Sequence, residues 1–374
     1  MVGVVLGLLV AACSGSDDPT ADVEDPPASE IDLSSVDPEL EELDLGVADR
    51  RHMAAVALPD DRLFLFGGLS LVGDGVRVHA DGVVYDVDEG TAGEVPPWPY
   101  DAPYDASALV VGSDVYVIGY PCPGLLPAAD DEVDCRSSKL EAALFDGEEW
   151  SELRSPSEDL DLPSHANTTR AFGISEGVAL FAIRGGEPEI IGLDLATGAW
   201  SELGEIALDE SSLCFDGAHL LRLDMAEDGM LESERLQVRS GEWVHDDGFD
   251  IGQPADFASW VACGPDAWAI ATSEADHAWT MAMLAPSGWE VVAKPFERPE
   301  FSLGVLQLPG GVLMWPGYEE LGPQLLVDDA PAWERLDVDW PGGNTPRLVQ
   351  LGSAVAVVFD GEGTDPSTYH LLEL

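Results

Sequence analysis

Residues Thr169 to Leu203 read as four short apolar strands separated by three turns. The strands are rich in Val, Ile, Leu and aromatic residues, and the turns have sequences such as Gly185-Gly186-Glu187-Pro188. A four-stranded meander of this length cannot bury both of its faces alone, so it needs copies of itself on either side. The stretch therefore predicts one unit of a repeat protein.

The same unit recurs from Arg51 onward, and its last strand carries a tryptophan in six copies. Successive tryptophans lie 43 to 52 residues apart, a period typical of propeller blades rather than of helical repeats. These tryptophans are Trp98, Trp150, Trp200, Trp243, Trp289 and Trp333. Seven strands that begin a unit are predicted, at Met53–Leu58, Ser107–Val111, Ala171–Ile174, Leu213–Phe215, Trp260–Cys263, Leu303–Leu308 and Leu348–Leu351.

The sequence predicts seven first strands but six last strands that carry a tryptophan, so the last unit lacks one strand. That unit ends at Tyr369–Leu374, which aligns with the third strand of the other units. Leu40–Leu45, just ahead of the first unit, is the segment that can supply the missing outer strand. Pairing the two segments closes the ring and removes exposed edges between blades. The predicted fold is an all-β, seven-bladed β-propeller of four-stranded antiparallel blades, spanning residues 38–374 and closed by an N-terminal strand.

Three features of the first unit resemble the Kelch or galactose-oxidase type of propeller repeat. Phe66-Gly67-Gly68 follows the second strand, Val84-Tyr85-Asp86 lies in the third, and Trp98 lies in the fourth. The double glycine recurs at Gly185-Gly186, whereas other units keep only part of the pattern. The resemblance implies a Kelch-like propeller. The rival architecture, a pair of β-sandwiches, is disfavoured by the even spacing of the units.

The first 13 residues form an apolar run that is too short to span a bilayer comfortably as a mature helix. The run ends in Val10-Ala11-Ala12-Cys13, which resembles a bacterial lipobox, although no Lys or Arg precedes it. The resemblance implies a lipoprotein-type signal peptide over residues 1–13 and an extracytoplasmic protein anchored to the cell membrane by a lipid on Cys13. An ordinary cleaved signal, or a buried strand with an incidental cysteine, is the alternative. Residues 14–37, rich in Asp, Glu, Pro and Ser, predict a disordered acidic tether.

The charge of the chain excludes two classes of partner. The 72 acidic and 16 basic residues give a formal net charge of -56. Nucleic acids and anionic lipid surfaces both need Lys and Arg for binding, so we expect no nucleic-acid partner and contact with the membrane only through the lipid. The acid excess fits either solubility in a salty exterior or divalent-cation binding, for instance at 130–134. Solubility is favoured because no segment has the spacing of a calcium loop, and no metal or other cofactor is predicted.

The five cysteines divide into Cys13, which would carry the lipid, and four others. An even number fits an oxidising compartment. Cys122 and Cys135 bracket the longest loop of the domain and are expected to close it. Cys214 and Cys263 lie near the ends of first strands in adjacent units, and this register would bring them together near the central channel. Two disulfides, Cys122–Cys135 and Cys214–Cys263, are therefore predicted, against the alternative of free buried cysteines.

Catalytic motifs are weak in this sequence. The string Gly173-Ile174-Ser175-Glu176-Gly177 matches the nucleophile elbow, but a predicted strand rather than a helix follows it. The seven histidines lack zinc-site spacing, and neither the copper-ligand set of galactose oxidase nor a sialidase Asp box is present. No catalytic residue is predicted.

A topological argument indicates which face of the ring binds. In a four-stranded meander, the loop from the second to the third strand and the loop to the next blade emerge on one face, which we call the long-loop face. Long loops on a rigid scaffold are common binding sites. The candidate ligand- or partner-binding residues at the mouth of the channel on this face are Arg51, His52, Tyr104, Arg170, Trp260, Phe301 and Arg347. The three arginines could receive an anionic group, or each could pair with a local Asp or Glu and cap the channel.

These features favour a non-catalytic binding or scaffolding protein, a lipid-anchored monomer that engages an envelope protein or glycan through the long-loop face. One alternative is an envelope enzyme acting on carbohydrate or another extracellular polymer, with carboxylates in the central cleft. Another is a surface domain with no defined ligand.

Overall fold

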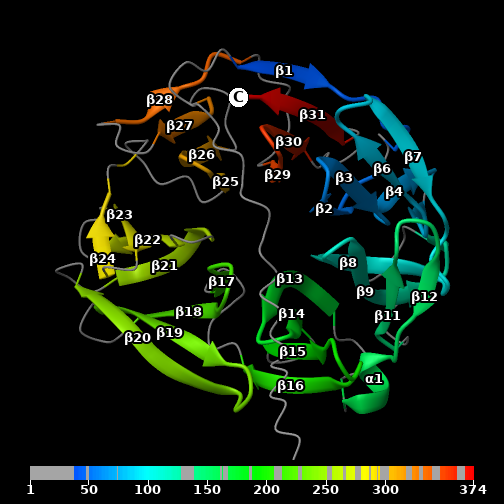
Figure 1. Ribbon diagram of the computed structural model, residues 1–374, viewed down its shortest axis with the longest axis horizontal. Helices are drawn as coiled ribbons and strands as arrows, with labels where there is room; N and C mark the ends of the chain where they lie inside the picture. The colour runs from blue at the N-terminus through cyan, green and yellow to red at the C-terminus, as the bar shows by residue number, and fades with distance from the viewer. Residues whose placement is uncertain are drawn as a thin grey trace, which may run out of the picture.

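The computed structural model describes residues 38–47, 50–73, 75–127, 139–160, 162, 167–184, 188–205, 213–225, 230–250, 255–263, 267–273, 279–285, 288–292, 294, 303–316, 322–327, 332–338, 346–359 and 367–374. Seven four-stranded antiparallel sheets follow one another around a ring (Figure 1). The predicted seven-bladed β-propeller is therefore confirmed. Within the described residues, no helix is long and apolar enough to cross a membrane.

Each blade runs from an innermost strand beside the channel to an outermost strand at the rim (Figure 1). Blade 1 consists of β2 (Ala54–Leu58), β3 (Arg62–Phe66), β6 (Gly82–Asp86) and β7 (Thr91–Val95), and blade 2 of β8 (Ala102–Val111), β9 (Asp114–Cys122), β11 (Glu141–Phe145) and β12 (Trp150–Glu152). Blade 3 consists of β13 (Asn167–Ser175), β14 (Val178–Arg184), β15 (Pro188–Asp194) and β16 (Trp200–Glu205), and blade 4 of β17 (Leu213–Phe215), β18 (Leu220–Met225), β19 (Met230–Gln237) and β20 (Glu242–Asp250). Blade 5 consists of β21 (Ala255–Ala262), β22 (Ala267–Ser273), β23 (Trp279–Ala285) and β24 (Gly288–Val291), and blade 6 of β25 (Leu303–Leu308), β26 (Gly311–Pro316), β27 (Gln324–Val327) and β28 (Glu334–Arg335).

Blade 7 is built from both ends of the domain. Its inner strands are β29 (Arg347–Leu351), β30 (Ala354–Phe359) and β31 (Thr368–Glu373), and its outermost strand is β1 (Glu39–Glu42). The amide of Leu43 continues this pairing with a 2.8 Å hydrogen bond to the carbonyl of Tyr369. The prediction that an N-terminal strand closes the ring is confirmed, and the strand covers the first part of the predicted segment.

The hydrophobic core lies between the blades, where the facing sheet surfaces pack together. Between blades 7 and 1, Leu43 and Leu45 pack with Leu65 of β3 and Val358 of β30. Between blades 1 and 2, Phe64 and Phe66 of β3 pack against Phe145 and Trp150 of the next blade. Every blade therefore depends on its neighbours for a dry core, as expected for a repeat fold.

Two of the predicted tryptophans form hydrogen bonds between neighbouring blades at the rim. Trp150 donates its indole N–H to the carbonyl of Pro96 over 2.8 Å, and Trp200 donates to the carbonyl of Arg154 over 2.7 Å. Each acceptor belongs to the segment that leaves the preceding blade. Trp150 and Trp200 thus satisfy their own donors while joining two blades. The indole N–H groups of Trp98, Trp243 and Trp289 are buried without a hydrogen-bond partner among the described residues.

Blades 1 and 2 carry a small extra sheet on the long-loop face. Its strands are β4 (Leu69–Val72), β5 (Gly75–Val78) and β10 (Leu125–Pro127), in the order β10-β5-β4. The connections between the second and third strands of these two blades therefore contain regular structure in the part that the structure describes. A four-residue helix, α1 (Pro156–Asp159), follows blade 2.

Candidate functional site

The central channel is an apolar cavity of about 640 Å³. Its walls come from the innermost strands of blades 1, 2, 3, 6 and 7, with residues such as Ala57, Leu109, Phe172, Leu306 and Val349. An innermost strand has a partner strand on only one side, and its other edge faces the channel. The channel therefore offers apolar walls together with backbone donors and acceptors.

The double glycine of blade 1 lets three segments meet at the long-loop end of this channel. Gly67 and Gly68 have φ values of +72° and +87°, a region that favours glycine. A Cβ atom on Gly68 would lie 2.6 Å from Cγ of Met53 and 2.7 Å from the carbonyl oxygen of Arg51. Without side chains here, the segment that leads into β2 can cross directly over the end of β3.

Backbone and side-chain bonds hold that leading segment in place. Arg51 exchanges two 2.8 Å backbone hydrogen bonds with Leu69, at the start of the extra sheet. The guanidinium of Arg50 donates to the carbonyl and to the carboxylate of Asp81, both over 2.9 Å. Because Arg50 is 9% exposed, this ion pair is shielded from solvent on the arginine side and orders the chain just before His52.

A β-bulge on β8 brings Asp105 to the same end of the channel. The register between β8 and β9 shifts between Tyr104 and Ser107, so that β8 carries extra chain beside Gly119. A Cβ atom on Gly119 would lie 2.9 Å from Cβ of Pro103, so a larger residue would push the bulge away. Asp105 lies in the bulge and has a φ of 49°, in the left-handed region.

His52 and Asp105 interact electrostatically across blades 1 and 2. Both are non-glycine residues in the left-handed region, since His52 has a φ of 53°. Burial raises the pKa of the Asp105 carboxyl to about 6, and the charge of His52 acts in the opposite direction. A carboxyl whose pKa is higher in the folded state than in the unfolded state favours folding most when it is protonated. The contribution of Asp105 to the free energy of unfolding is therefore lost as pH rises from about 4 to about 6. Strain and an unfavourable buried charge at one place are typical of functional sites.

The structure gives the side chains of two of the predicted arginines backbone partners. Arg347, the first residue of β29, donates to the carbonyl of Met53. Arg170 donates to the carbonyl of Leu213 over 3.4 Å and lies over the ring of Phe172, 5.4 Å from its centroid. These partners are backbone carbonyls of other blades rather than the local Asp or Glu side chains of the capping alternative. Anion binding by Arg51, Arg170 and Arg347 stays a prediction.

The structure also places two other predicted residues, Tyr104 and Trp260. Tyr104 pairs with Tyr120 across β8 and β9, immediately before the bulge. Trp260 is 6% exposed and stacks on Trp289 with ring centroids 5.6 Å apart, so it belongs to the core between blades 4 and 5 rather than to the mouth. The sequence predicts a strand that starts at Trp260, whereas β21 begins five residues earlier, at Ala255. Phe301, Cys13 and Cys135 lie outside the described residues.

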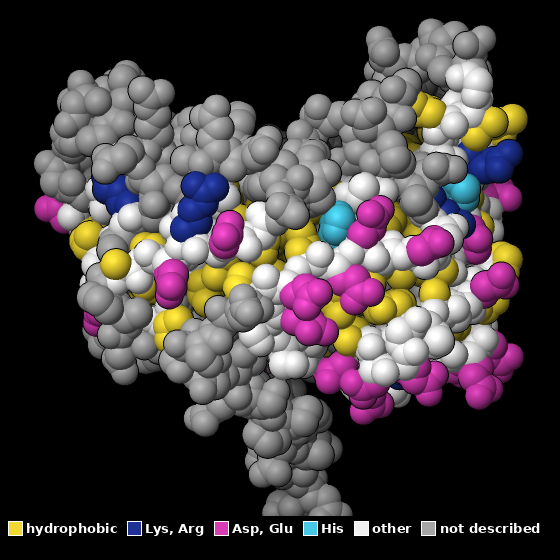
Figure 2. Space-filling view, turned by 90° about the horizontal axis from the view of Figure 1, so that it is seen from above, with side chains coloured by type: hydrophobic (Ala, Val, Ile, Leu, Met, Phe, Trp, Pro, Cys, Tyr) yellow, Lys and Arg dark blue, Asp and Glu magenta, His cyan; other side chains and the backbone are white. Residues whose placement is uncertain are grey.

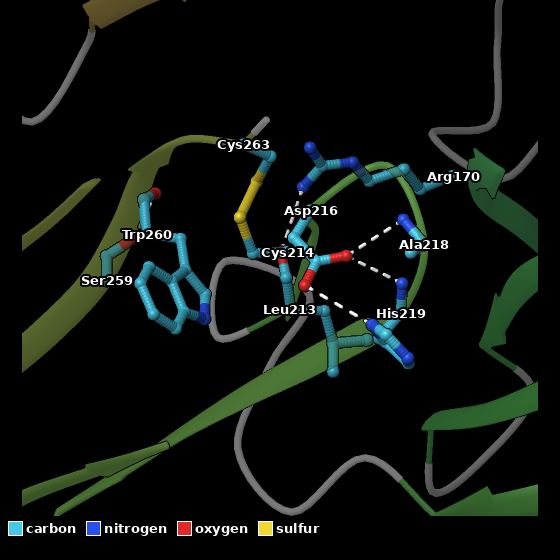
Figure 3. Close-up of a disulfide and its surroundings, with 9 residues drawn as sticks. All are labelled: Arg170, Leu213, Cys214, Asp216, Ala218, His219, Ser259, Trp260 and Cys263. Carbon is cyan, nitrogen blue, oxygen red and sulfur yellow. Dashed lines mark hydrogen bonds and ion pairs between the residues drawn. A yellow bond between two sulfur atoms is a disulfide. The ribbon is translucent and has the colours of Figure 1, made fainter. Parts of the chain in front are cut away.

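The predicted disulfide between Cys214 and Cys263 is present and links blades 4 and 5 (Figure 3). The Cα atoms are 5.3 Å apart, and the bond joins Cys214, in the middle of β17, to Cys263, the residue that follows β21. Figure 3 also shows Arg170 reaching the carbonyl of Leu213 beside the bond. Cys122 is disulfide-bonded as well.

The residue that sequence reasoning missed is Asp105. It follows Tyr104, which was singled out, and it is the single carboxylate among the described side chains of the innermost strands. A charged residue inside an otherwise apolar inner strand was the available signal. Among the described residues, no group of His, Cys, Asp and Glu side chains is arranged to hold a metal ion.

Comparisons with known proteins support the fold. No family model matches the chain, and no curated protein sequence matches it. Among solved structures, it is similar to YCF48 bound to D1 peptide, with a TM-score of 0.52 and 14% identity over 90% of this chain and 97% of that chain. It is also similar to a puromycin-hydrolyzing peptidase from Mycobacterium tuberculosis, with a TM-score of 0.53 and 14% identity over 87% of this chain and 52% of that chain. At this identity the likeness shows the fold alone, a seven-bladed β-propeller, and the narrower Kelch resemblance stays a prediction.

Proposed function

We propose that this chain is an extracytoplasmic, lipid-anchored binding protein, monomeric, that engages an envelope protein or glycan through the mouth of its central channel. The observation that carries the proposal is the pairing of an apolar channel of about 640 Å³ with a strained, charged mouth formed by His52 and Asp105. Ligand sites in proteins typically combine apolar walls with a few placed polar groups. A propeller of similar fold is described as bound to a peptide, which makes a protein partner the first choice.

The test removes the charges of the mouth without changing its backbone. Asparagine tolerates the left-handed region, so His52→Asn with Asp105→Asn keeps the two φ values accessible. We expect this double variant to lose partner capture from a bacterial envelope extract by about tenfold or more, measured by quantitative mass spectrometry of the recovered proteins and glycans.

Asp60→Asn is the matched control. Asp60 also has a backbone in the left-handed region, with a φ of 62°. Its side chain is exposed, and it lies in the turn between β2 and β3 on the opposite face. Capture by this control should equal that of the unchanged protein. Equal capture by the double variant would contradict the assignment of the mouth, and release of a shortened polymer from the extract would favour the enzyme instead.

The enzyme hypothesis has one supporting observation, the Asp105 carboxyl at the channel mouth with its raised pKa. Glycoside hydrolysis uses two carboxyl groups separated by roughly 5 to 9.5 Å. The described side chains of the innermost strands supply one. Binding stays the function that we propose because the apolar channel and its charged mouth both support it.

The proposed membrane anchor rests on Val10-Ala11-Ala12-Cys13. Replacing Cys13 with Ser removes the thiol that would carry the lipid. In a bacterial host grown with labelled palmitate, we expect the unchanged protein to carry the label and to sediment with membranes, and the variant to do neither. Labelling of the variant would contradict the anchor.

A further inference from the structure

A second cavity lies between blades 1 and 2, on the face opposite the channel mouth. Its volume is about 420 Å³, and it opens beside the hairpin turns rather than the long loops. We call it the inter-blade groove. The residues that line it and are used below are Leu58, Arg62, Val84, Asp86, Gly93, Glu94, Val115, Phe145, Asp146 and Glu148.

The groove combines an apolar floor with an acidic rim. Leu58, Val115 and Phe145 are at most 8% exposed and form the floor. Four carboxylates, from Asp86, Glu94, Asp146 and Glu148, line the groove against one guanidinium, from Arg62, so the lining has a net charge of −3. Such a surface suits a group that has an apolar stem and a cationic end.

Two of these carboxylates are held by the turns that carry them. Oδ1 of Asp146 accepts 2.9 Å hydrogen bonds from the amides of Glu148 and Glu149, and these bonds lower the pKa of Asp146. Oδ1 of Asp86 accepts from the amide of Glu89 over 2.9 Å. The bonds that orient both groups use one oxygen each, which leaves Oδ2 for a ligand.

Gly93 opens the groove, although the fold does not require a glycine there. It lies in the middle of β7, opposite Val84. A Cβ atom on Gly93 would meet only the carbonyl oxygen of Val84, at an ordinary contact distance of 3.8 Å, and its φ is not in the left-handed region. Glycine costs stability inside a strand, and it often marks a place where a ligand or another backbone comes close.

The strand beside the groove is accessible to a partner. β7 is the outermost strand of blade 1, and its residues Thr91 to Glu94 are exposed. An edge strand of this kind can pair with an extended peptide, while side-chain pockets beside it select the sequence. β7 and the groove therefore offer backbone pairing and a side-chain site next to each other.

From these observations we propose that the inter-blade groove binds an extended, lysine-bearing segment of a partner protein. The lysine stem lies on Leu58, Val115 and Phe145, and the ammonium group lies among the carboxylates of Asp86, Glu94 and Asp146. This site is separate from the channel mouth and does not depend on the function proposed for it.

The charge of the whole chain agrees with a basic partner. The formal net charge is -56, so the chain attracts cationic segments over a distance of about one Debye length. In Figure 2, Asp and Glu side chains gather toward the lower edge of the described surface, whereas Lys and Arg side chains lie higher. The turns at the hairpin ends of blades 1 to 3 are acidic, with Asp60, Asp61, Asp88, Glu89, Asp146, Glu148, Glu149 and Glu176.

The test measures binding of dye-labelled, capped pentapeptides by the purified full chain. The probe alternates lysine with valine, a second peptide carries norleucine in place of lysine, and a third carries glutamate. We expect the lysine peptide to bind at least tenfold more tightly than the other two at low salt. Fluorescence anisotropy provides the dissociation constants.

Two variants locate the site by different means. Gly93→Leu fills the groove, and Glu94→Gln with Glu148→Gln removes two of its charges. Each variant should weaken binding of the lysine peptide at least tenfold. Glu202→Gln with Glu334→Gln is the matched control, because both residues are exposed on outermost strands of other blades and the charge change is the same. It should change binding less than twofold.

Three results would each overturn the proposal. One is no binding of the lysine peptide, and a second is equal binding of the lysine and norleucine peptides. The third is unchanged binding by either groove variant, once circular dichroism and thermal unfolding show that the variant is folded. Equal weakening by the control and by the charge variant would also count against it, because binding would then follow net charge alone.

Discussion

Replacing Leu43 and Leu45 together with alanine is expected to unfold most of the protein at room temperature. These side chains are 8% and 4% exposed and pack between the closing strand and the neighbouring blades. Each buried Leu→Ala change costs about 2–5 kcal/mol, so the pair costs about 6 kcal/mol, which is comparable to the whole stability of many domains. Urea unfolding followed by tryptophan fluorescence measures the loss.

The same strand supplies the control for this prediction. Glu39 and Glu41 lie on β1 with exposed side chains, so replacing both with alanine should change the free energy of unfolding by less than about 1 kcal/mol. A double leucine variant as stable as the control would mean that the ring does not depend on its N-terminal closure.

Replacing Cys214 and Cys263 together with serine is expected to lower the free energy of unfolding by about 4 kcal/mol. The bond closes a loop whose ends are 49 residues apart, and the chain-entropy estimate for a loop of that length gives this value. The measurement is chemical unfolding of the unchanged and double-serine proteins under oxidising conditions.

Reduction provides the control for the disulfide. With a strong reductant present, the difference between the two proteins should shrink to about 1 kcal/mol or less, because both then lack the bond. A difference of the same size with and without reductant would assign the loss to packing of the new side chains instead.

The blades and their closure could be predicted from the sequence because both depend on local patterns. Each innermost strand is a short apolar run followed by a turn, as in Ala54–Leu58 before Arg62–Phe66. The missing seventh outer strand followed from comparing copies of one unit, and Leu40–Leu45 was the available segment. The bounds were less accurate, since β1 ends at Glu42.

The extra sheet and the bulge could not be predicted because they depend on contacts between units. β5 pairs with β10, in the next blade, and nothing within either segment identifies the other as its partner. Asp105 gains its place only when the strand bulges opposite Gly119. Trp260 was misplaced because its strand begins further upstream, so that its position in β21 falls within the core.

The closure by β1 also constrains the order in which the protein folds. Glu39 pairs with Glu373, so among the strands that the structure describes, the one made first pairs with the one made last. Blades 1 to 6 contain only strands that lie close together in the sequence, and they can form while the chain is still growing. Blade 7 must wait for the whole chain, and until then β1 and the apolar edge of blade 1 stay exposed. We therefore expect closure to be the slowest folding step and the open ring to be the species most prone to aggregation.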